Sequence, residues 1–204
     1  MPRPSTRGKL IDAGLAVLHA QGFHGCSIQD IVDAAGVPKG SFFNHFKSKE
    51  LLALEALQAY GATSRMEMLA DPAQAPLERL RGHFEFLARG YEHHRFERGC
   101  LIGNLATEVA HSHGPLREAL RSAFDYWCDA VAGCVREAQQ RGEVAPEHDA
   151  QQLARFLVNA WQGAVMRAKV VRGRAPIDEF FAVSFGLLLA APEPARRKRP
   201  VVRG

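Results

Sequence analysis

The chain has 204 residues, of which 47% are hydrophobic and 24% are charged, a composition that is typical of globular proteins and excludes a wholly disordered chain. The formal net charge of +4 is concentrated at the two ends: residues 1–50 hold 6 Lys and Arg against 4 Asp and Glu, and residues 195–204 hold 5 against none. We therefore expect an anionic partner for the ends of the chain and not for its slightly acidic middle.

Cysteine usage and the longest apolar run indicate where the protein resides. Cys26, Cys100, Cys128 and Cys134 follow no metal-binding or disulfide spacing, and the start MPRPSTRGKL lacks the apolar run of a signal peptide. These features predict a cytoplasmic protein with reduced thiols. The run FFAVSFGLLLAA at 180–191 is shorter than the roughly 20 residues that span a bilayer, so we expect a buried helix and no membrane contact.

Apolar residues recur at helical spacing along nearly the whole chain, and no segment shows the period of two that strands require. The first predicted helix carries an apolar stripe over 10–18 and stops at Gln21 and Gly22. Ser27 and Asp30 have the spacing of a capping box that begins a second helix. The sequence therefore predicts an all-α fold.

The next elements are a very short helix and a long one. Gly36 is expected to end the second helix, and Pro38 suits the first position of a third helix of barely two turns. Ser48 begins a fourth helix that is predicted to run past Met66 toward Ala70. After the break DPAQAP, Gly and Pro residues separate five further predicted helices, at about 77–95, 101–112, 115–141, 148–172 and 177–190.

Residues 27–50 have the arrangement of a helix-turn-helix, since two short helices joined by a glycine turn follow a longer helix. Phe42 and Phe46 are four residues apart and can anchor the second short helix on the first. The outward residues Lys39, Ser41, Phe43 and Asn44 could touch phosphate, a base edge or a thymine methyl group, and Gly40 allows close approach. Spacing alone is also compatible with a small helical subdomain that has an exposed polar face.

The stretch from Thr6 to Leu57, with the motif SIQDIVDAAGVPKGSFFNHFKSKELL, closely resembles the N-terminal DNA-binding domain of TetR-type transcriptional regulators. The resemblance implies DNA contacts by Ser27 and Gln29 at phosphate or base, by Lys39, Ser41 and Asn44 in the major groove, and by His45 and Lys49 at the backbone. One position departs from the family, which usually has Tyr where this chain has Phe43. We expect Phe43 to pack against a sugar or a thymine methyl group instead.

The predicted domain organisation follows the same resemblance. Residues 1–52 form the helix-turn-helix DNA-binding domain, with a connecting helix to about 70, residues 71–192 form a ligand-binding and dimerisation domain, and residues 193–204 form a basic disordered tail. The expected partners are double-stranded DNA with a palindromic operator, a small-molecule inducer and a second copy of the chain. A palindromic site requires a symmetric dimer.

Two segments of the larger domain are candidates for the dimer interface. A strip of small residues, Ala160, Ala164 and Ala168, lies at helical spacing, and Phe180, Phe181, Phe185 and Leu188 supply bulk. Two such helices from each chain could form a four-helix interface. The alternative is that these residues form an ordinary core within one chain.

The segment ERGCLIGNLATEVA, at 97–110, suggests a sensing thiol. Cys100 stands where a helix begins, and Arg95 and Arg98 are close in sequence; helix amides and cations both stabilise a thiolate. The segment is also similar to that of the NemR-like and acrylate-responsive branch of the family. The alternatives are a reversible ligand in the same region and a Cys100 that is simply a small buried residue.

Further candidates for a ligand pocket follow from position alone, and each could instead be plain core. They are Phe84, Phe86, Leu87, Tyr91, Asn104, Trp127, Trp161 and Met166. The histidines near His93, together with Glu108, lack the helix spacing of metal ligands, so we expect no metal. No nucleotide-binding glycine loop or Ser-His-Asp order occurs, and no cofactor is expected.

Taken together, the sequence predicts a homodimeric, ligand-responsive DNA-binding regulator that acts as a repressor and is released by a small molecule or an electrophile. Two other functions stay open at this point. One is a thiol-dependent enzyme that acts on small electrophiles through Cys100. The other is a non-specific nucleic-acid binder that uses the run ARRKRPVVRG, since a basic run adds affinity without sequence preference.

Overall fold

Helices make up nearly all of the computed structural model, which describes residues 5–190. No strand occurs within this range, which confirms the all-α prediction. The elements are α1 (Thr6–Gly25), α2 (Ile28–Ala35), α3 (Lys39–Phe43), α4 (Lys49–Thr63), the 3-10 helix η1 (Met66–Ala70), α5 (Pro76–His93), α6 (Leu101–Val109), α7 (Gly114–Gln140), α8 (Ala150–Val171), α9 (Ala175–Val183) and the π-helical turn η2 (Ser184–Leu188).

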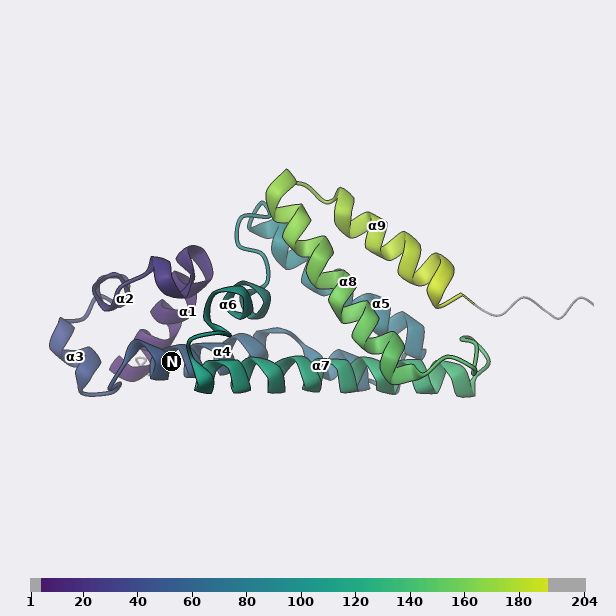
Figure 1. Ribbon diagram of the computed structural model, residues 1–204, viewed down its shortest axis with the longest axis horizontal. Coiled ribbons are helices and arrows are strands. Elements are labelled where there is room, and N and C mark those ends of the chain that lie inside the picture. Colours follow the sequence, from purple (N-terminus) through teal and green to yellow (C-terminus); the bar gives the residue numbers. More distant parts are fainter. Residues whose placement is uncertain (1–4, 191–204) are drawn as a thin grey trace, which may run out of the picture.

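The helices form two groups that α6 connects (Figure 1). Helices α1 to α4 form a small bundle at one end, in which α1 packs on α2 and α4. In the larger group α7 packs on α5 and α8, and α8 packs on α9. Because α6 packs on both α1 and α7, this short helix lies at the junction of the two groups.

Local sequence signals explain the boundaries of the short helices. Ser27 accepts a hydrogen bond from the Asp30 amide, and the Asp30 carboxylate accepts one from the Ser27 amide, so the predicted capping box is confirmed. Gly36 has a φ of 64°, the left-handed geometry that ends α2. Pro38 differs from the prediction: it is the N-cap of α3 and has extended backbone, and the helix begins one residue later at Lys39.

Two expected helices are interrupted. The assigned α1 continues to Gly25, but Gly22 breaks it with a φ of 78° and a ψ of 176°, as the glycine signal indicated. The predicted continuous helix from Ser48 toward Ala70 is wrong, because α4 ends at Thr63 and Arg65 takes a left-handed φ of 54° before η1. This break gives η1 a direction of its own, so η1 packs on α5 and α7.

Aromatic side chains fill the core of the larger group. The rings of Phe84, Trp161 and Phe180 pack with centroids 5.0 Å apart in each pair, and all three are buried. Phe181 is buried as well. The expectation that Phe180 and Phe181 form the dimer surface is therefore wrong, because both face the interior of their own chain.

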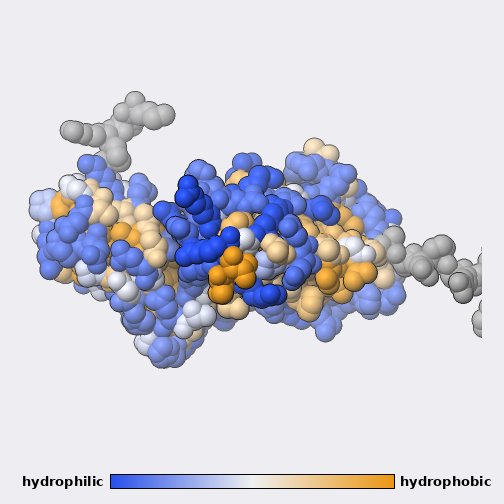
Figure 2. Space-filling model, turned by 90° about the horizontal axis from the view of Figure 1, so that it is seen from above, coloured by the Kyte–Doolittle hydropathy of each residue, from blue (hydrophilic) through white to orange (hydrophobic). Residues whose placement is uncertain are grey.

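Other residues of the same helices face outward. Six of the nine large hydrophobic residues that are exposed in residues 5–190 belong to α8, α9 or η2: Phe156, Met166, Val170, Val171, Val183 and Leu187. Seen from above, hydrophobic residues gather over this part of the larger group (Figure 2). No helix in the described range is long and apolar enough to cross a membrane, and the predicted tail at 193–204 lies outside that range.

Candidate DNA-binding surface and ligand cavity

The turn between α2 and α3 presents one side of α3 to solvent. Phe42 and Phe46 are 0% and 2% exposed and anchor α3 inward, as predicted, whereas Phe43 is 54% exposed. The exposed face, which we call the recognition surface, consists of Lys39, Gly40, Ser41, Phe43, Asn44 and His45, of which only Ser41 is partly covered. It carries amide, hydroxyl and ammonium groups around one aromatic ring, a set that can contact phosphates and base edges.

Two of the residues expected to contact DNA from α2 already have intramolecular partners. The Ser27 hydroxyl is 2.7 Å from a carboxylate oxygen of Asp30 and accepts from the Asp30 amide. The Gln29 side-chain amide donates to Asp33 at 2.7 Å. Both side chains are exposed. The single hydroxyl hydrogen of Ser27 is donated to Asp30, so a phosphate would have to replace that bond, whereas the Gln29 amide keeps a second N–H for a DNA contact.

Lys49 differs most from its predicted role. Its ammonium donates to the carbonyl oxygens of Phe23 and Cys26, each at 2.6 Å, and lies 4.5 Å from the centre of the Phe23 ring. Three favourable contacts hold a partly buried cation against the end of α1. We therefore assign Lys49 to holding α4 against α1 and remove it from the set of free phosphate contacts.

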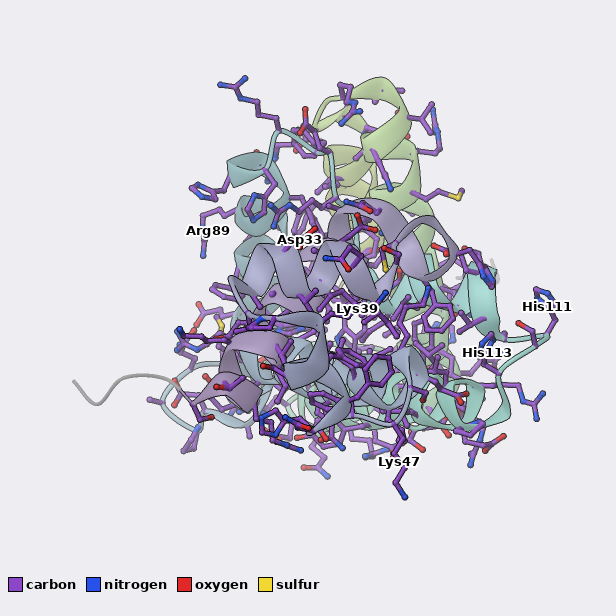
Figure 3. All side chains as sticks on the ribbon, turned by 90° about the vertical axis from the view of Figure 1, so that its left-hand side faces the viewer. Asp33, Lys39, Lys47, Arg89, His111 and His113 are labelled. Carbon is purple, nitrogen blue, oxygen red and sulfur yellow. The ribbon has the colours of Figure 1, made fainter. Side chains whose placement is uncertain are left out.

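The structure adds a residue that the sequence analysis missed. Lys47 is exposed in the loop between α3 and α4, and its side chain projects into solvent on the same end of the molecule as Lys39 (Figure 3). A lysine between two anchored segments is a natural phosphate contact. The signal was available, since Lys47 lies within the motif, but its outward direction depends on how the loop folds.

Helix α6 connects the small bundle to the larger group through α1. The Glu108 carboxylate accepts a hydrogen bond from the His24 amide at 3.0 Å, and the His24 ring lies 3.2 Å from the Glu108 carbonyl oxygen. Gly22 touches the same carboxylate closely: a Cβ at this position would lie 2.2 Å from Oε1. At the other end of α6, His19 donates to the Gly99 carbonyl oxygen at 2.7 Å.

A partly open cavity of about 140 Å³ lies where α4, α5, α6 and α7 meet. It is mostly apolar, no charged side chain lines it, and its wall includes Tyr60, Met66, His83, Tyr91, Cys100 and Trp127. A cavity of roughly 150 Å³ is large enough for a benzene-sized ligand. Because Tyr60 belongs to α4 and Cys100 is the N-cap of α6, both elements that connect to the small bundle form part of this wall.

Cys100 is buried, with 4% of its surface exposed. Its sulfur accepts from the Gln162 side-chain amide at 3.4 Å and from the Tyr60 hydroxyl at 3.9 Å. Burial raises the pKa of Tyr60 well above its ordinary value, so this hydroxyl stays protonated and remains a donor. The hydrogen-bond donors to the thiol are thus two neutral groups, whereas the sequence predicts the cations Arg95 and Arg98 beside it.

The cavity wall also contains buried polar groups without a hydrogen-bond partner among the described residues. Neither ring nitrogen of His83 makes a hydrogen bond of good geometry, although the Arg65 backbone is near enough to favour the protonated ring, and the Trp127 indole nitrogen has no partner. The two rings are 6.0 Å apart. Burial lowers the pKa of His83 to about 4, while the Arg65 backbone and Glu67 oppose this, so the ring is neutral at pH 7. Unpartnered buried donors are costly, and a ligand with an acceptor could satisfy them.

The other predicted pocket residues divide into three groups. Tyr91, Leu87 and Trp127 line the cavity. Phe84 and Trp161 are fully buried in the aromatic core and do not line it. Asn104 donates to the Arg98 carbonyl oxygen at 2.7 Å and holds the loop before α6, and Met166 is 62% exposed.

His83 was missed because a single histidine in a helical stripe carries no signal of its burial. Across residues 5–190 no three His, Cys, Asp or Glu side chains are grouped to hold a metal ion.

These features define a class of protein in which a helix-turn-helix is joined to a larger helical domain that holds a mostly apolar cavity. Comparison with known proteins identifies the family. Residues 10–56 match the model described as bacterial regulatory proteins, tetR family, and residues 76–183 match the tetracyclin repressor-like C-terminal domain. The chain belongs to the TetR family of transcriptional regulators.

Individual relatives agree with this assignment. The chain is 35% identical to the HTH-type transcriptional repressor DhaR of Mycobacterium sp. (strain GP1), over 95% of this chain and 97% of the relative. It is 27% identical to the repressor NemR of Escherichia coli (strain K12), over 87% and 90%. A solved TetR regulatory protein from Rhodobacter sphaeroides superposes with a TM-score of 0.81 at 35% identity, over 86% of this chain and 95% of that chain.

Proposed function

We propose that this TetR-family regulator is a homodimeric repressor that leaves a palindromic operator when a small molecule enters the cavity. The observation that carries the proposal is the double role of α6. Its N-cap residue, Cys100, lines the cavity, and Glu108 near its other end holds His24 of α1. A ligand that moves α6 therefore acts on the helix that supports the recognition surface.

Operator binding is assigned to the recognition surface together with Lys47. The two copies of α3 in a dimer must enter successive major grooves, so half-sites should lie about one helical turn apart. Selection of binding sites from random duplex DNA tests this directly. An enriched inverted repeat with that spacing is the expected result; enrichment of a single half-site, or of none, would contradict the proposal.

The outward apolar residues of α8, α9 and η2 support the dimer. Val183 and Leu187 are 47% and 73% exposed, and Phe156 on α8 is 52% exposed. These side chains line or border grooves between the two helices, one of which contains the predicted small residues Ala160 and Ala164. Contiguous exposed apolar surface of this kind marks protein contacts. Leu187→Glu should yield monomers in sedimentation, whereas the same change at Met166 should not.

The domain boundaries of the proposal are residues 1–52 for DNA binding, a connection to about 70, and 71–192 for sensing and dimerisation. The break at Arg65 between α4 and η1 supports the connection. It places Tyr60 and Met66, from the two sides of the break, in the same cavity wall. Displacement of either residue by a ligand would change the angle at which α4 leaves the larger domain.

A covalent form of induction is favoured by one further observation, the position of the Cys100 sulfur at the cavity wall with two donors. Covalent induction would be an addition of the Cys100 thiol to an electrophile. The sulfur forms a bond to one alkene carbon of the electrophile, and the neighbouring alkene carbon takes up the thiol proton. N-ethylmaleimide should release operator DNA from the wild type and leave Cys100→Ser bound. Release from both proteins would exclude Cys100. Repeated turnover of the electrophile would instead indicate an enzyme.

A further inference from the structure

A second, open cleft adjoins the cavity and has a different chemical character. Its volume is about 570 Å³, and it lies between α1, the end of α4, α5 and the loop that precedes α6. Its ionisable side chains are His19, Arg89, His93, His94 and Arg98, with Asp12 the carboxylate on its wall. We call it the cationic cleft.

The two arginines of this cleft have no salt-bridge partner in the part of the chain that the structure describes, although Asp12 lies on the cleft wall. Among residues 5–190 neither Arg89 nor Arg98 forms an ion pair. Arg174 shows the contrast, because it pairs with Glu85, Glu92 and Asp178. Arginine is the residue that best binds planar anions, so two unpaired arginines on one cleft are a suitable binding site.

Two histidines of the cleft have lowered pKa values, chiefly through burial and to a lesser extent through the surrounding positive charge. Burial and the charges of Arg98, His94 and Lys169 lower the pKa of His19. Burial, Arg98 and His93 likewise lower the pKa of His94. An anion in the cleft would stabilise all of these groups at once, because each gains a partner of opposite charge.

The cationic cleft and the cavity share a wall. Tyr60, Ser64, Leu87 and Tyr91 line both of them. The cavity carries no charged group and the cleft carries the arginines, so an apolar and a cationic compartment meet at these four residues. A molecule with a short apolar chain and an anionic end would fit this division.

We propose that the cationic cleft binds the anionic end of the inducer, a small organic acid whose apolar part enters the cavity between Tyr60 and Leu87. This inference deepens the proposed function and rests on it, since it names the chemical class of the inducer. The anion would lie against α1, where His19 holds Gly99. Binding of the anion would thereby act on the contact between α1 and the loop that precedes α6.

The cations of the cleft could instead bind the phosphates of DNA. In the view from the helix-turn-helix end, Arg89 lies at the left-hand side of the molecule, away from Lys39 and Lys47 (Figure 3). Arg89 therefore faces another direction than the two lysines, which favours a small anion over the operator backbone as its partner.

Calorimetric titration of the full chain, without DNA and at constant ionic strength, tests the proposal with three matched probes. Hexanoate and hexyl phosphate carry an anion, and hexanamide has the same chain without charge. We expect either anion to bind the wild type at least about tenfold more tightly than the amide, since charge-assisted bonds exceed neutral ones. Arg98→Gln should remove this preference.

Arg136→Gln is the control, because Arg136 is exposed on α7 and does not line the cleft. Equal binding of hexanoate and hexanamide to the wild type would overturn the proposal. So would equal losses in the two variants, absence of binding by both anions at millimolar concentration, or a loss of operator affinity in Arg98→Gln without any change in anion binding. A protein that binds the anion but selects no operator would refute the proposed function and leave the cleft assignment intact.

Discussion

Replacement of Gly22 by Ala is expected to weaken the contact between α1 and α6 and to destabilise the protein. At a φ of 78° and a ψ of 176°, a side chain suffers backbone strain of about 1 to 3 kcal/mol. The new Cβ would also lie 2.2 Å from the Glu108 carboxylate, and moving that carboxylate breaks its bond to the His24 amide, worth about 1 kcal/mol at a partly exposed site. We therefore expect Gly22→Ala to lower the free energy of unfolding by about 2 to 4 kcal/mol.

Urea unfolding of four proteins measures both contributions: the wild type, Gly22→Ala, Glu108→Ala and the double variant. In the Glu108→Ala background the clash is absent, so Gly22→Ala should then cost only the backbone strain. Gly25→Ala is the matched control, since its Cβ would lie 3.7 Å from the nearest atom, in Gln21. If Gly22→Ala lowered the free energy of unfolding equally with and without the Glu108 side chain, a clash with Glu108 would be refuted. If Gly22→Ala lowered it by less than about 0.5 kcal/mol, backbone strain at this position would be refuted as well.

Three further predictions follow from the recognition surface and the cavity. Lys49→Met should destabilise the free protein by about 2 kcal/mol through loss of its carbonyl contacts, whereas Lys47→Met should leave unfolding unchanged and weaken operator binding with a smaller salt dependence. Phe43→Tyr, at a 54% exposed position, should leave stability unchanged and tighten operator binding in a gel shift. Because the His83 pKa of about 4 lies below the unfolded value, the unfolded chain binds more protons at acid pH. Stability should fall by about 3 kcal/mol from pH 6.5 to pH 4, and His83→Phe should remove that part of the loss.

The helix-turn-helix could be predicted from the sequence because its determinants are local. The capping box at Ser27 and Asp30, the left-handed Gly36 and the pair Phe42 and Phe46 each act within about four residues. Such short-range signals fix both the helix boundaries and the outward direction of Phe43. The family motif rests on these same positions.

Long-range contacts limited the other predictions. Lys49 reads as a free cation in the sequence, but its partners Phe23 and Cys26 are 26 and 23 residues away. Phe180 and Phe181 lie in an apolar run whose periodicity is compatible with either an interface or a core. Their burial depends on Trp161 and Phe84 on other helices.

Local patterns in the sequence were enough to predict the helical class and the residues of the recognition surface, and they led to the hypothesis of a sensing role for the segment around Cys100. The positions of Cys100 and His83 in one cavity, and of Arg89 and Arg98 in one cleft where neither forms an ion pair with another residue of 5–190, follow from the three-dimensional arrangement alone. The physical reason is that capping and helix amphipathicity are properties of neighbouring residues, whereas a cavity, a buried neutral histidine or an unpaired arginine depends on which distant side chains are absent from its surroundings.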